Sequence, residues 1–443
     1  MGVKYRELTQ TGVHTVMGTV VNPAGITLAK SVPVARLDTF HRAGLGAAAV
    51  WHAFCADSGI AFSPSITAVG DLRIRLDAEV VRNLGGGVAW GPADFFDQSG
   101  EPDPRCPRGL LRSVGQRLAD AGLAARIGHE LEFVLVAPDG SALTDTSWIP
   151  YGVTGLLDRE AFLADLHAAA HAAGLAIEQV HAEYGRNQFE FSLPPLEPVA
   201  AADAVVLAKI LVGRVARRHG LRASFSPVPF PGALGNGAHQ HFSLTRAGAP
   251  LFSGGRGPHG MTGEGGAAIA GVVRGLPDIQ GFLTGSVLSG ERLVPGQWSG
   301  AHACWGMENR EAAVRFLAAG PANPHGANFE VKIIDPSANV YIASAAVLAL
   351  ALDGITTHAE LPAEVTDDPA TLTERQWAAL RLTVLSSQVG TVLDVLDKSA
   401  RARQLVGDAI VDTTVVARRH EQTHHAEKSP EERAELFRLA WSI

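Results

Sequence analysis

Two glutamates stand two positions apart at the start of an apolar stretch, and this pattern limits how the chain can fold. The stretch reads Gly-His-Glu-Leu-Glu-Phe-Val-Leu-Val over residues 128–136. The apolar run predicts a β-strand, and residues two apart on a strand point to the same face. Glu130 and Glu132 therefore repel each other unless cations neutralise them. An isolated pair of this kind is most often a solvated outer face, so its meaning depends on what the fold brings beside it.

Further acids and histidines stand on other predicted strands. Glu183 and Glu190 bracket a turn between two short strands. Each alone is most simply a surface acid, but together they can return two carboxylates to one place. His239, His241 and Ser243 share one face of a strand that follows a glycine-rich loop. A His-x-His pair on a strand is more often structural, although it can also supply metal ligands or bind anionic oxygens.

Basic residues join this set in the second half of the chain. Glu330 and Lys332 share a face of a predicted strand, where an ion pair is the simplest interpretation. Arg292, Arg310 and Arg315 lie in a segment rich in glycine and polar residues. The planar fork of arginine fits carboxylate and phosphate oxygens, although scattered arginines are ordinarily surface features. Added together, so many hard oxygen ligands suit Mg²⁺ or Mn²⁺ and a phosphate-rich substrate.

Net charge and cysteine usage exclude several classes of protein. The formal net charge of −8 argues against a nucleic-acid coat or a protein that binds anionic membranes. Cys55, Cys106 and Cys304 are too far apart for a CxxC zinc site and too few for a disulfide scaffold. The N-terminus has no apolar core of signal-peptide type, and the longest nearly apolar run, 342–352, is too short to cross a bilayer. We therefore expect a soluble, cytoplasmic protein that binds neither nucleic acid nor membrane.

The pattern of predicted elements divides the chain near residue 105. Residues 1–105 are rich in predicted strands, with a hairpin-like turn at 22–25. Residues 106–443 alternate between strands and helices, and a hydrophobic fraction of 46% is enough to bury a large core. The predicted strands of this second part are 126–136, 177–183, 188–193, 239–244 and 329–335. Its predicted helices are 108–122, 159–174, 200–218 and 339–353, and a helical tail begins after about residue 370.

Taken in order, these motifs resemble the glutamine synthetase family, and the resemblance covers essentially the whole chain. Six segments carry it: Gly128–Phe133, Glu183–Glu190, Gly235–Leu244, Arg292–Gly296, Asn309–Arg315 and Glu330–Asn339. Within the family, the chain is most similar to the γ-glutamylpolyamine and γ-glutamyl amide synthetases of actinobacteria. The resemblance implies an α+β protein. A β-grasp domain at 1–105 would precede a catalytic α/β domain at 106–443, built on an antiparallel sheet.

The resemblance also implies which residues hold metal ions. One divalent cation would bind Glu132, Glu183 and Glu190, and a second would bind Glu130, His239 and Glu330. The cofactor set implied is ATP, as a substrate, with two or three Mg²⁺ or Mn²⁺ ions. Three protein ligands per ion leave coordination positions open for substrate oxygens, which phosphoryl transfer requires.

Roles toward the substrates follow in the same way. By resemblance, Arg310 and Arg315 offset charge on the transferred phosphoryl group, and Ser243 and Arg315 bind ATP. The residues that would bind glutamate are Gly235, His241, Arg292 and Lys332. ATP would phosphorylate the γ-carboxylate of glutamate, and an amine would then displace phosphate to form an amide.

Asp57 resembles an aspartate that, in this family, a neighbouring subunit contributes to the amine pocket. We therefore expect a homo-oligomer with active sites shared between subunits, arranged as a dodecamer of two six-membered rings.

Four departures from the family pattern bear on the substrates. Trp298 stands on the flap over the amine pocket, where the family has a glutamate that attracts ammonium and removes a proton. Lys332 and Asn328 replace arginines, and Leu234 replaces an asparagine. We therefore expect a ligase that uses an organic amine, with a polyamine favoured and ethanolamine second. We also expect Trp298 to have a catalytic role. The alternatives are an ammonia-using glutamine synthetase and a non-catalytic assembly protein.

Overall fold

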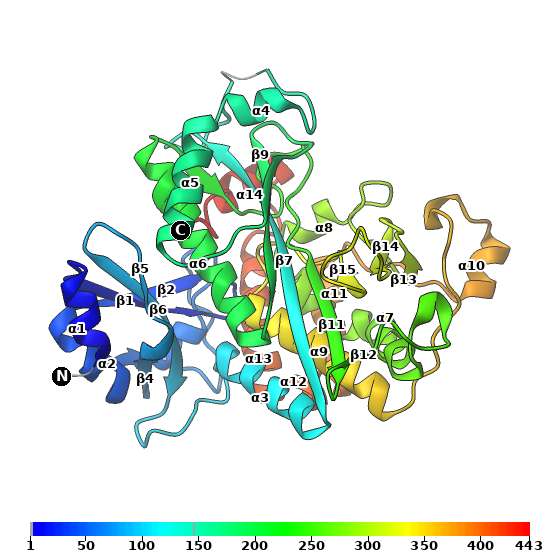
Figure 1. Cartoon of the computed structure of the whole chain (residues 1–443), viewed down its shortest axis with the longest axis horizontal. Coiled ribbons are helices and arrows are strands. Elements are labelled where there is room, and N and C mark those ends of the chain that lie inside the picture. Colours follow the sequence, from blue (N-terminus) through cyan, green and yellow to red (C-terminus); the bar gives the residue numbers. More distant parts are fainter. Residues whose placement is uncertain (1–2, 145–146) are drawn as a thin grey trace.

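Two β-sheets organise the chain, and Figure 1 shows the smaller one at the left, in blue, beside the larger one. The structure is a computed structural model that describes residues 3–144 and 147–443. The smaller sheet has the strand order β2-β1-β6-β4-β3, and β5 pairs with β6. Its elements are α1 (Val3–Gln10), β1 (Thr15–Val21), β2 (Thr27–Pro33), α2 (Leu37–Arg42), β3 (Leu45–Ala48), β4 (Asp71–Leu76), β5 (Arg82–Asn83) and β6 (Val88–Phe96).

The first hairpin forms where the turn residues predict it. β1 and β2 pair antiparallel, and Gly25 in the turn between them has φ +76°, a conformation that glycine adopts without a steric cost. β1 also pairs in parallel with β6, so the sheet is mixed. A core of its own fills this part, and Leu8 of α1 and Phe40 of α2 pack into it. The division at residue 105 stays a prediction.

The larger sheet has the strand order β13-β14-β15-β11-β7-β9-β8, with β10 paired to β7 and β12 to β11. Its pairs are antiparallel except for β13 and β14. Its strands are β7 (Leu123–Val136), β8 (Gln179–Ala182), β9 (Gln188–Leu196), β10 (Arg222–Ser224), β11 (Gln240–Arg246), β12 (Ala249–Pro250), β13 (His302–Met307), β14 (Ala312–Leu317) and β15 (Asn328–Val331).

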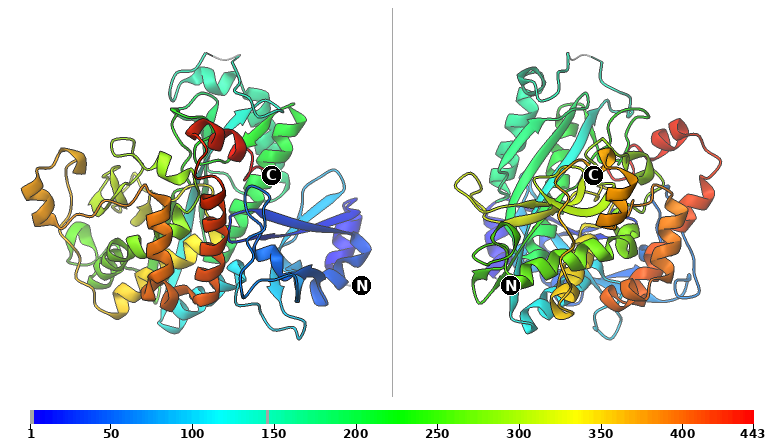
Figure 2. Two further views of the ribbon diagram at one scale, coloured as in Figure 1. Left: turned by 180° about the vertical axis from the view of Figure 1, so that it is seen from behind. Right: turned by 90° about the vertical axis from the view of Figure 1, so that its right-hand side faces the viewer.

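Helices pack around this sheet and supply most of the core. They are α3 (Pro107–Asp120), α4 (Val153–Leu157), α5 (Glu160–Ala172), α6 (Pro198–Arg218), α7 (Gly263–Leu283), α8 (Ser289–Arg292), α9 (Val340–Thr356), α10 (Glu374–Leu380), α11 (Val389–Lys398), α12 (Ala400–Val406), α13 (Asp408–His424) and α14 (Pro430–Phe437). The left view of Figure 2, from behind, shows α11 in orange and α13 in red on the side toward the viewer, with α13 next to the N-terminal part in blue. The predicted α+β class with an antiparallel catalytic sheet is confirmed. Within the described residues, no helix combines the length and apolarity needed to cross a membrane.

All five strands predicted in the second part have somewhat different bounds in the structure, and the differences in β8, β11 and β15 affect site residues. β8 ends at Ala182, so Glu183 stands just beyond it. The strand predicted at 329–335 is β15, which ends at Val331, because Asp335 begins a turn in which its carboxylate accepts the N–H of Ser337 at 2.9 Å. The strand predicted at 239–244 begins one residue later, so His239 belongs to the loop that leads into β11. Asn339, predicted inside a helix, caps α9 by accepting main-chain N–H groups with its side-chain oxygen.

The tip of the first hairpin is anchored in the second part of the chain. Asn339 Nδ2, at the start of α9, donates to the carbonyl oxygens of Val21 and Asn22 at 3.1 and 2.9 Å. Trp441 Nε1, near the C-terminus, donates to the Ala24 carbonyl oxygen at 2.9 Å. Main-chain groups of the N-terminal sheet are therefore satisfied by side chains several hundred residues away.

Candidate active site

Neighbouring strands of the larger sheet carry acids and histidines to one face. Glu132 on β7 stands directly opposite Glu190 on β9 in the antiparallel register. Beyond β7 the sheet continues with β11 and β15, and His241 stands opposite Glu330. Directly paired residues present their side chains on the same face of a sheet. The register thus gathers side chains that lie far apart in the sequence.

The carboxylates and imidazoles approach one another closely. His239 Nδ1 lies 3.4 Å from Glu130 Oε2 and 3.3 Å from Glu330 Oε1. These three residues are the set predicted for one metal ion. Of the other predicted set, Glu183 and Glu190 approach the Nε2 atom of His181, at 3.1 and 3.7 Å.

The donor atoms close enough to share a metal ion are grouped differently from the two predicted sets. Within the described residues, donors that lie within 4.8 Å of one another at this face are those of Glu130, Glu190 and His239, of Glu130, His241 and Glu330, and of His181, Glu183 and Glu190. Glu132 belongs to none of these groups, and its Oε2 accepts a hydrogen bond from Gln188 Nε2 at 3.0 Å. His181 was not predicted, although its alternation with Glu183 along one strand was a readable signal.

Burial opposes the ionisation of the acids at this face. Burial raises the pKa of Glu190 well above its usual range, and the neighbouring carboxylates raise it further. Burial also raises the pKa of Glu132. Burial opposes the ionisation of Glu130 too, but hydrogen bonds from His239 and His241 hold its pKa low. A bound divalent cation would relieve this repulsion, and carboxylate oxygens are the donors that Mg²⁺ and Mn²⁺ prefer, so the residues fit such ions.

Basic side chains border the same group of acids. Lys332 Nζ donates to Glu330 Oε1 at 3.1 Å, and Arg315 Nη1 donates to Glu330 Oε2 at 3.2 Å. Although burial opposes the ionisation of Glu330, the Lys332 ammonium brings its pKa to about 2. Arg292 is buried and donates to the carbonyl oxygens of Ile333 and Lys332, at 3.0 and 3.2 Å. Main-chain oxygens thus hold Arg292 in place at the edge of the acids.

A cavity of about 890 Å³ opens above these side chains. Most of the predicted site residues line it, namely Glu130, Glu132, Glu183, Glu190, Gly235, His239, His241, Arg292, Trp298, Arg310, Arg315 and Lys332. A side chain at Gly235 would collide with Arg292 and with the Pro227 carbonyl oxygen, so only glycine lets the loop pass this close. Three predicted residues lie elsewhere: Glu330 is buried beneath the floor, and Ser243 and Asp57 are outside the cavity.

Ser243 lines an adjoining pocket of about 310 Å³, and His241 borders both spaces. His241 Nδ1 donates to Asn328 Oδ1 at 3.0 Å, and Asn328 Nδ2 donates to the Gly326 carbonyl oxygen at 3.1 Å. Asn328 therefore fixes the orientation of the His241 ring. The two spaces therefore adjoin at His241.

Comparisons with known proteins identify the family. The model of the family described as "Glutamine synthetase, catalytic domain" matches residues 104–435. The chain belongs to the glutamine synthetase family. It is 38% identical over 421 residues to the gamma-glutamylpolyamine synthetase GlnA3 of Streptomyces coelicolor, covering 93% of this chain and 90% of that protein. It is 32% identical over 318 residues to the glutamine synthetase of Pyrococcus abyssi, covering 71% of each chain.

Solved structures of the same family share the fold over almost the full length. A glutamine synthase homologue superposes with a TM-score of 0.85 at 29% identity, covering 96% of this chain and 98% of that one. A GmaS/ADP complex superposes with a TM-score of 0.85 at 26% identity, covering 98% of each chain. The protein is thus an ATP-dependent ligase of the glutamine synthetase type, and glutamate, ATP and an amine are the substrates that this family implies.

The loop after α8, which the family resemblance predicts to be the flap, borders the cavity and carries Trp298. Its side chain is 51% exposed and its backbone adopts a left-handed φ of +55°. The main-chain N–H groups of Gly296 and Trp298 donate to the two carboxylate oxygens of Glu311, at 3.1 and 2.9 Å. Glu311 is buried. Sequence analysis did not single it out, because nothing in the local pattern shows that a carboxylate 13 residues later holds the flap. Arg310 beside it is exposed and lines the cavity.

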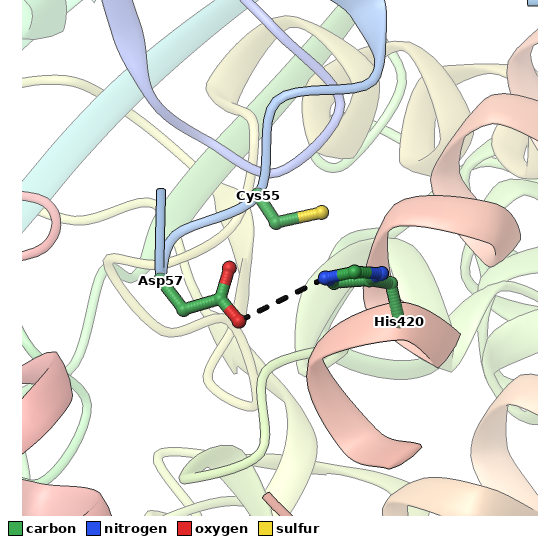
Figure 3. A group of neighbouring side chains, drawn as sticks. All are labelled: Cys55, Asp57 and His420. Atoms are coloured by element: carbon green, nitrogen blue, oxygen red, sulfur yellow. Dashed lines mark ion pairs between the residues drawn. The ribbon is translucent and has the colours of Figure 1, made fainter. Parts of the chain in front are cut away.

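Asp57 occupies a separate place, where the N-terminal part meets α13. Its Oδ2 lies 2.7 Å from His425 Nε2 and 3.9 Å from His420 Nε2. Figure 3 shows Asp57, Cys55 and His420 pointing toward one another. Burial raises the pKa of the Cys55 thiol to about 12, and the carboxylates of Glu421 and Asp57 contribute. Asp57 is not among the residues that line the cavity.

Proposed function

We propose that this protein joins the γ-carboxyl group of glutamate to an organic amine, with a polyamine preferred and ethanolamine second. The γ-phosphoryl group of ATP moves to a γ-carboxylate oxygen and ADP leaves. The amine nitrogen then attacks the γ-carbonyl carbon, the bond to the phosphate oxygen breaks, and the amine loses a proton. The 38% identity to a gamma-glutamylpolyamine synthetase supports this choice.

The observation that carries the proposal is that the flap position is a tryptophan, Trp298, and not a carboxylate. A carboxylate above the amine pocket would attract ammonium and accept its proton. Trp298 can do neither, and its indole reshapes the wall of the cavity. Glu311, the acid that holds this loop, is buried and already accepts two main-chain N–H groups with both its oxygens. It cannot turn toward an amine without releasing the flap, which disfavours ammonia as the substrate.

The floor of the cavity supports the metal and phosphoryl roles. We assign metal binding to Glu130, Glu132, Glu183, Glu190, His239 and Glu330, and the structure adds His181 beside Glu183 and Glu190. Bound there, Mg²⁺ or Mn²⁺ would offset the repulsion between a carboxylate and a triphosphate. Arg310 and Arg315 would offset charge on the phosphoryl group in transit. Arg292, held by main-chain oxygens, would present its remaining donors to the α-carboxylate of glutamate.

We further propose that each active site is completed by a second copy of the chain, and that twelve subunits form two six-membered rings. Asp57 lies outside the cavity of its own subunit. The loop that carries it exposes apolar side chains, with Phe62 59% and Val69 83% exposed. Exposed apolar side chains in one loop are typical of a contact between subunits.

A release assay for ADP with glutamate and a panel of amines tests the activity. We expect kcat/KM to rank putrescine and spermine above ethanolamine, and ethanolamine above ammonium. Omitting glutamate supplies the background rate of ATP hydrolysis, and aspartate in its place tests the acceptor. If ammonium gives the highest kcat/KM, the argument from Trp298 is wrong and the protein is an ammonia-using glutamine synthetase. If no amine supports ADP release, the non-catalytic alternative takes first place.

A further inference from the structure

Exposed aromatic side chains are concentrated on the cavity. In the part of the chain that the structure describes, the aromatic side chains more than about a third exposed are Phe62, Tyr151, Tyr184 and Trp298. Tyr151, Tyr184 and Trp298 all line the same cavity. They come from three separate loops, before α4, between β8 and β9, and after α8. Large aromatic side chains are ordinarily buried, so three half-exposed ones around a single opening indicate a binding surface.

Two of these three residues have unfavourable backbone conformations. Tyr151 has φ +58° and Trp298 has φ +55°, in the left-handed region that bulky residues rarely adopt. A glycine or asparagine would take the same conformation at lower cost. Strained positions of this kind cluster at ligand sites, where the surrounding structure holds them.

The two tyrosines are tied to the acidic floor through one carboxylate. The Tyr151 ring stacks on the His181 ring with 6.0 Å between centroids, and His181 Nε2 lies 3.1 Å from Glu183 Oε1. The main-chain N–H of Tyr184 donates to Glu183 Oε2 at 2.7 Å. The Tyr151 ring and the main chain of Tyr184 are therefore held beside the floor, and both tyrosines line the cavity.

An aromatic face attracts an alkylammonium group through its quadrupole and packs against methylene groups. A polyamine that reacts at the floor has a second cationic end a few methylene groups away. Ammonium has no such end, and ethanolamine has a neutral hydroxyl group there. A ring of aromatic faces above an acidic floor therefore matches a chain that is cationic at both ends.

We infer that Tyr151, Tyr184 and Trp298 form an aromatic rim that binds the non-reacting ammonium group of a diamine or longer polyamine. This inference rests on the proposed function, since it assigns the specificity of the same cavity. Tyr184 is the determinant best suited to a test, because its bond to Glu183 comes from its main-chain N–H, which a change of side chain leaves in place.

A matched pair of amines separates recognition of the second charge from everything else. Putrescine and butylamine have the same four-carbon chain, but butylamine lacks the second ammonium group. We expect Tyr184→Leu and Trp298→Leu each to lower the ratio of kcat/KM for putrescine to kcat/KM for butylamine by about 2- to 30-fold. Leucine keeps apolar bulk and removes the π-face. Tyr184→Phe, which keeps the face, is the control and should preserve the wild-type ratio.

The outcomes separate the rim from the ligase activity. If amines support ADP release but Tyr184→Leu leaves the ratio unchanged, the rim is overturned and the proposed function stands. If no amine supports ADP release, titration calorimetry of putrescine and butylamine against the intact protein replaces the kinetic ratio. In that case, weaker binding of putrescine alone in Tyr184→Leu supports the rim, and unchanged binding overturns it.

Discussion

The catalytic cavity and the cluster around Asp57 contain the same kinds of side chain in opposite states. In the cavity, several carboxylates face one open space, and burial with mutual repulsion raises the pKa of Glu190 well above its usual range. At the other site, one carboxylate meets the His425 ring at 2.7 Å and accepts the N–H of Gly59 at 2.8 Å. Although burial opposes its ionisation, these hydrogen bonds lower the pKa of Asp57.

The difference shows that residue type alone does not mark a ligand site. In the first region burial opposes the ionisation of Glu132 and Glu190, so a bound cation would favour the charged form of both. The second satisfies its carboxylate within the subunit. Carboxylates that border an open cavity and whose ionisation is opposed by burial are thus a better sign of a cation site than acids and histidines that merely lie close together.

The largest expected effect is the loss of turnover when the cavity loses an acid. Glu132→Ala and Glu130→Ala should each lower the rate of ADP release by about 10³-fold or more, because several kcal/mol of charge stabilisation are lost with the metal ion. Glu101→Ala removes an exposed carboxylate of the N-terminal part and should leave the rate unchanged. A rate near that of the wild type in Glu132→Ala would contradict the two-metal assignment.

Mixing two inactive variants tests whether the cavity of one subunit and the Asp57 loop of another form one active site. Asp57→Ala and Glu132→Ala should each be inactive alone. In a re-assembled equal mixture, roughly one site in four would combine an intact cavity with an intact Asp57 loop, so about a quarter of the wild-type activity should return. An active, monodisperse monomer in light scattering would exclude shared sites.

Mn²⁺ should raise the thermal stability of the protein by binding in the cavity and not at the cluster around Asp57. At about 100 times its dissociation constant, a bound ion adds about 2.7 kcal/mol, which raises Tm by a few degrees. Differential scanning fluorimetry should show this shift in the wild type and in Asp57→Ala, but not in Glu190→Gln. In EDTA, Glu190→Gln should melt above the wild type, because the uncompensated buried carboxylate is gone. Equal shifts in all three proteins would place the ion elsewhere.

The smallest expected effect is on thiol reactivity in the cluster around Asp57. Burial raises the pKa of Cys55 to about 12, so roughly one thiol in 10⁴ is ionised at pH 8. Cys106 and Cys304 are also buried with pKa values raised to about 12. We therefore expect no reaction with a thiol-specific disulfide reagent in the folded protein, and three equivalents after unfolding in guanidinium. Fast labelling of the folded protein would show that the Asp57 cluster opens.

Strand periodicity predicted much of the fold and the floor of the cavity. Alternation along one strand places Glu130 and Glu132 on one face, and this requires no knowledge of partners. Which strands lie side by side is non-local, and the family motifs supplied that information. The opposition of His241 and Glu330 across β11 and β15 follows from a register that no single segment contains.

The residues that sequence analysis missed depend on contacts over distance. Glu311 acts on the main chain of the flap, and Tyr184 reads as an ordinary turn residue until the cavity wall is formed. The partner of Asp57, His425, lies 368 residues away in the sequence. No periodicity connects positions so far apart, since only the packing of α13 against the N-terminal part brings them together.

The anchoring of the first hairpin by Asn339 and Trp441 bears on how this protein can be dissected. A fragment beginning at residue 106 would leave both side chains without the acceptors that they have in the intact chain. The same cut would remove Asp77 and Asp94, which bind the buried Arg108 guanidinium at 2.9 and 2.7 Å. Grafting the N-terminal sheet of a relative onto this catalytic part would therefore succeed only if the graft brought matching carbonyl and carboxylate positions. The two parts therefore depend on each other for buried hydrogen bonds and ion pairs, although sequence composition separates them.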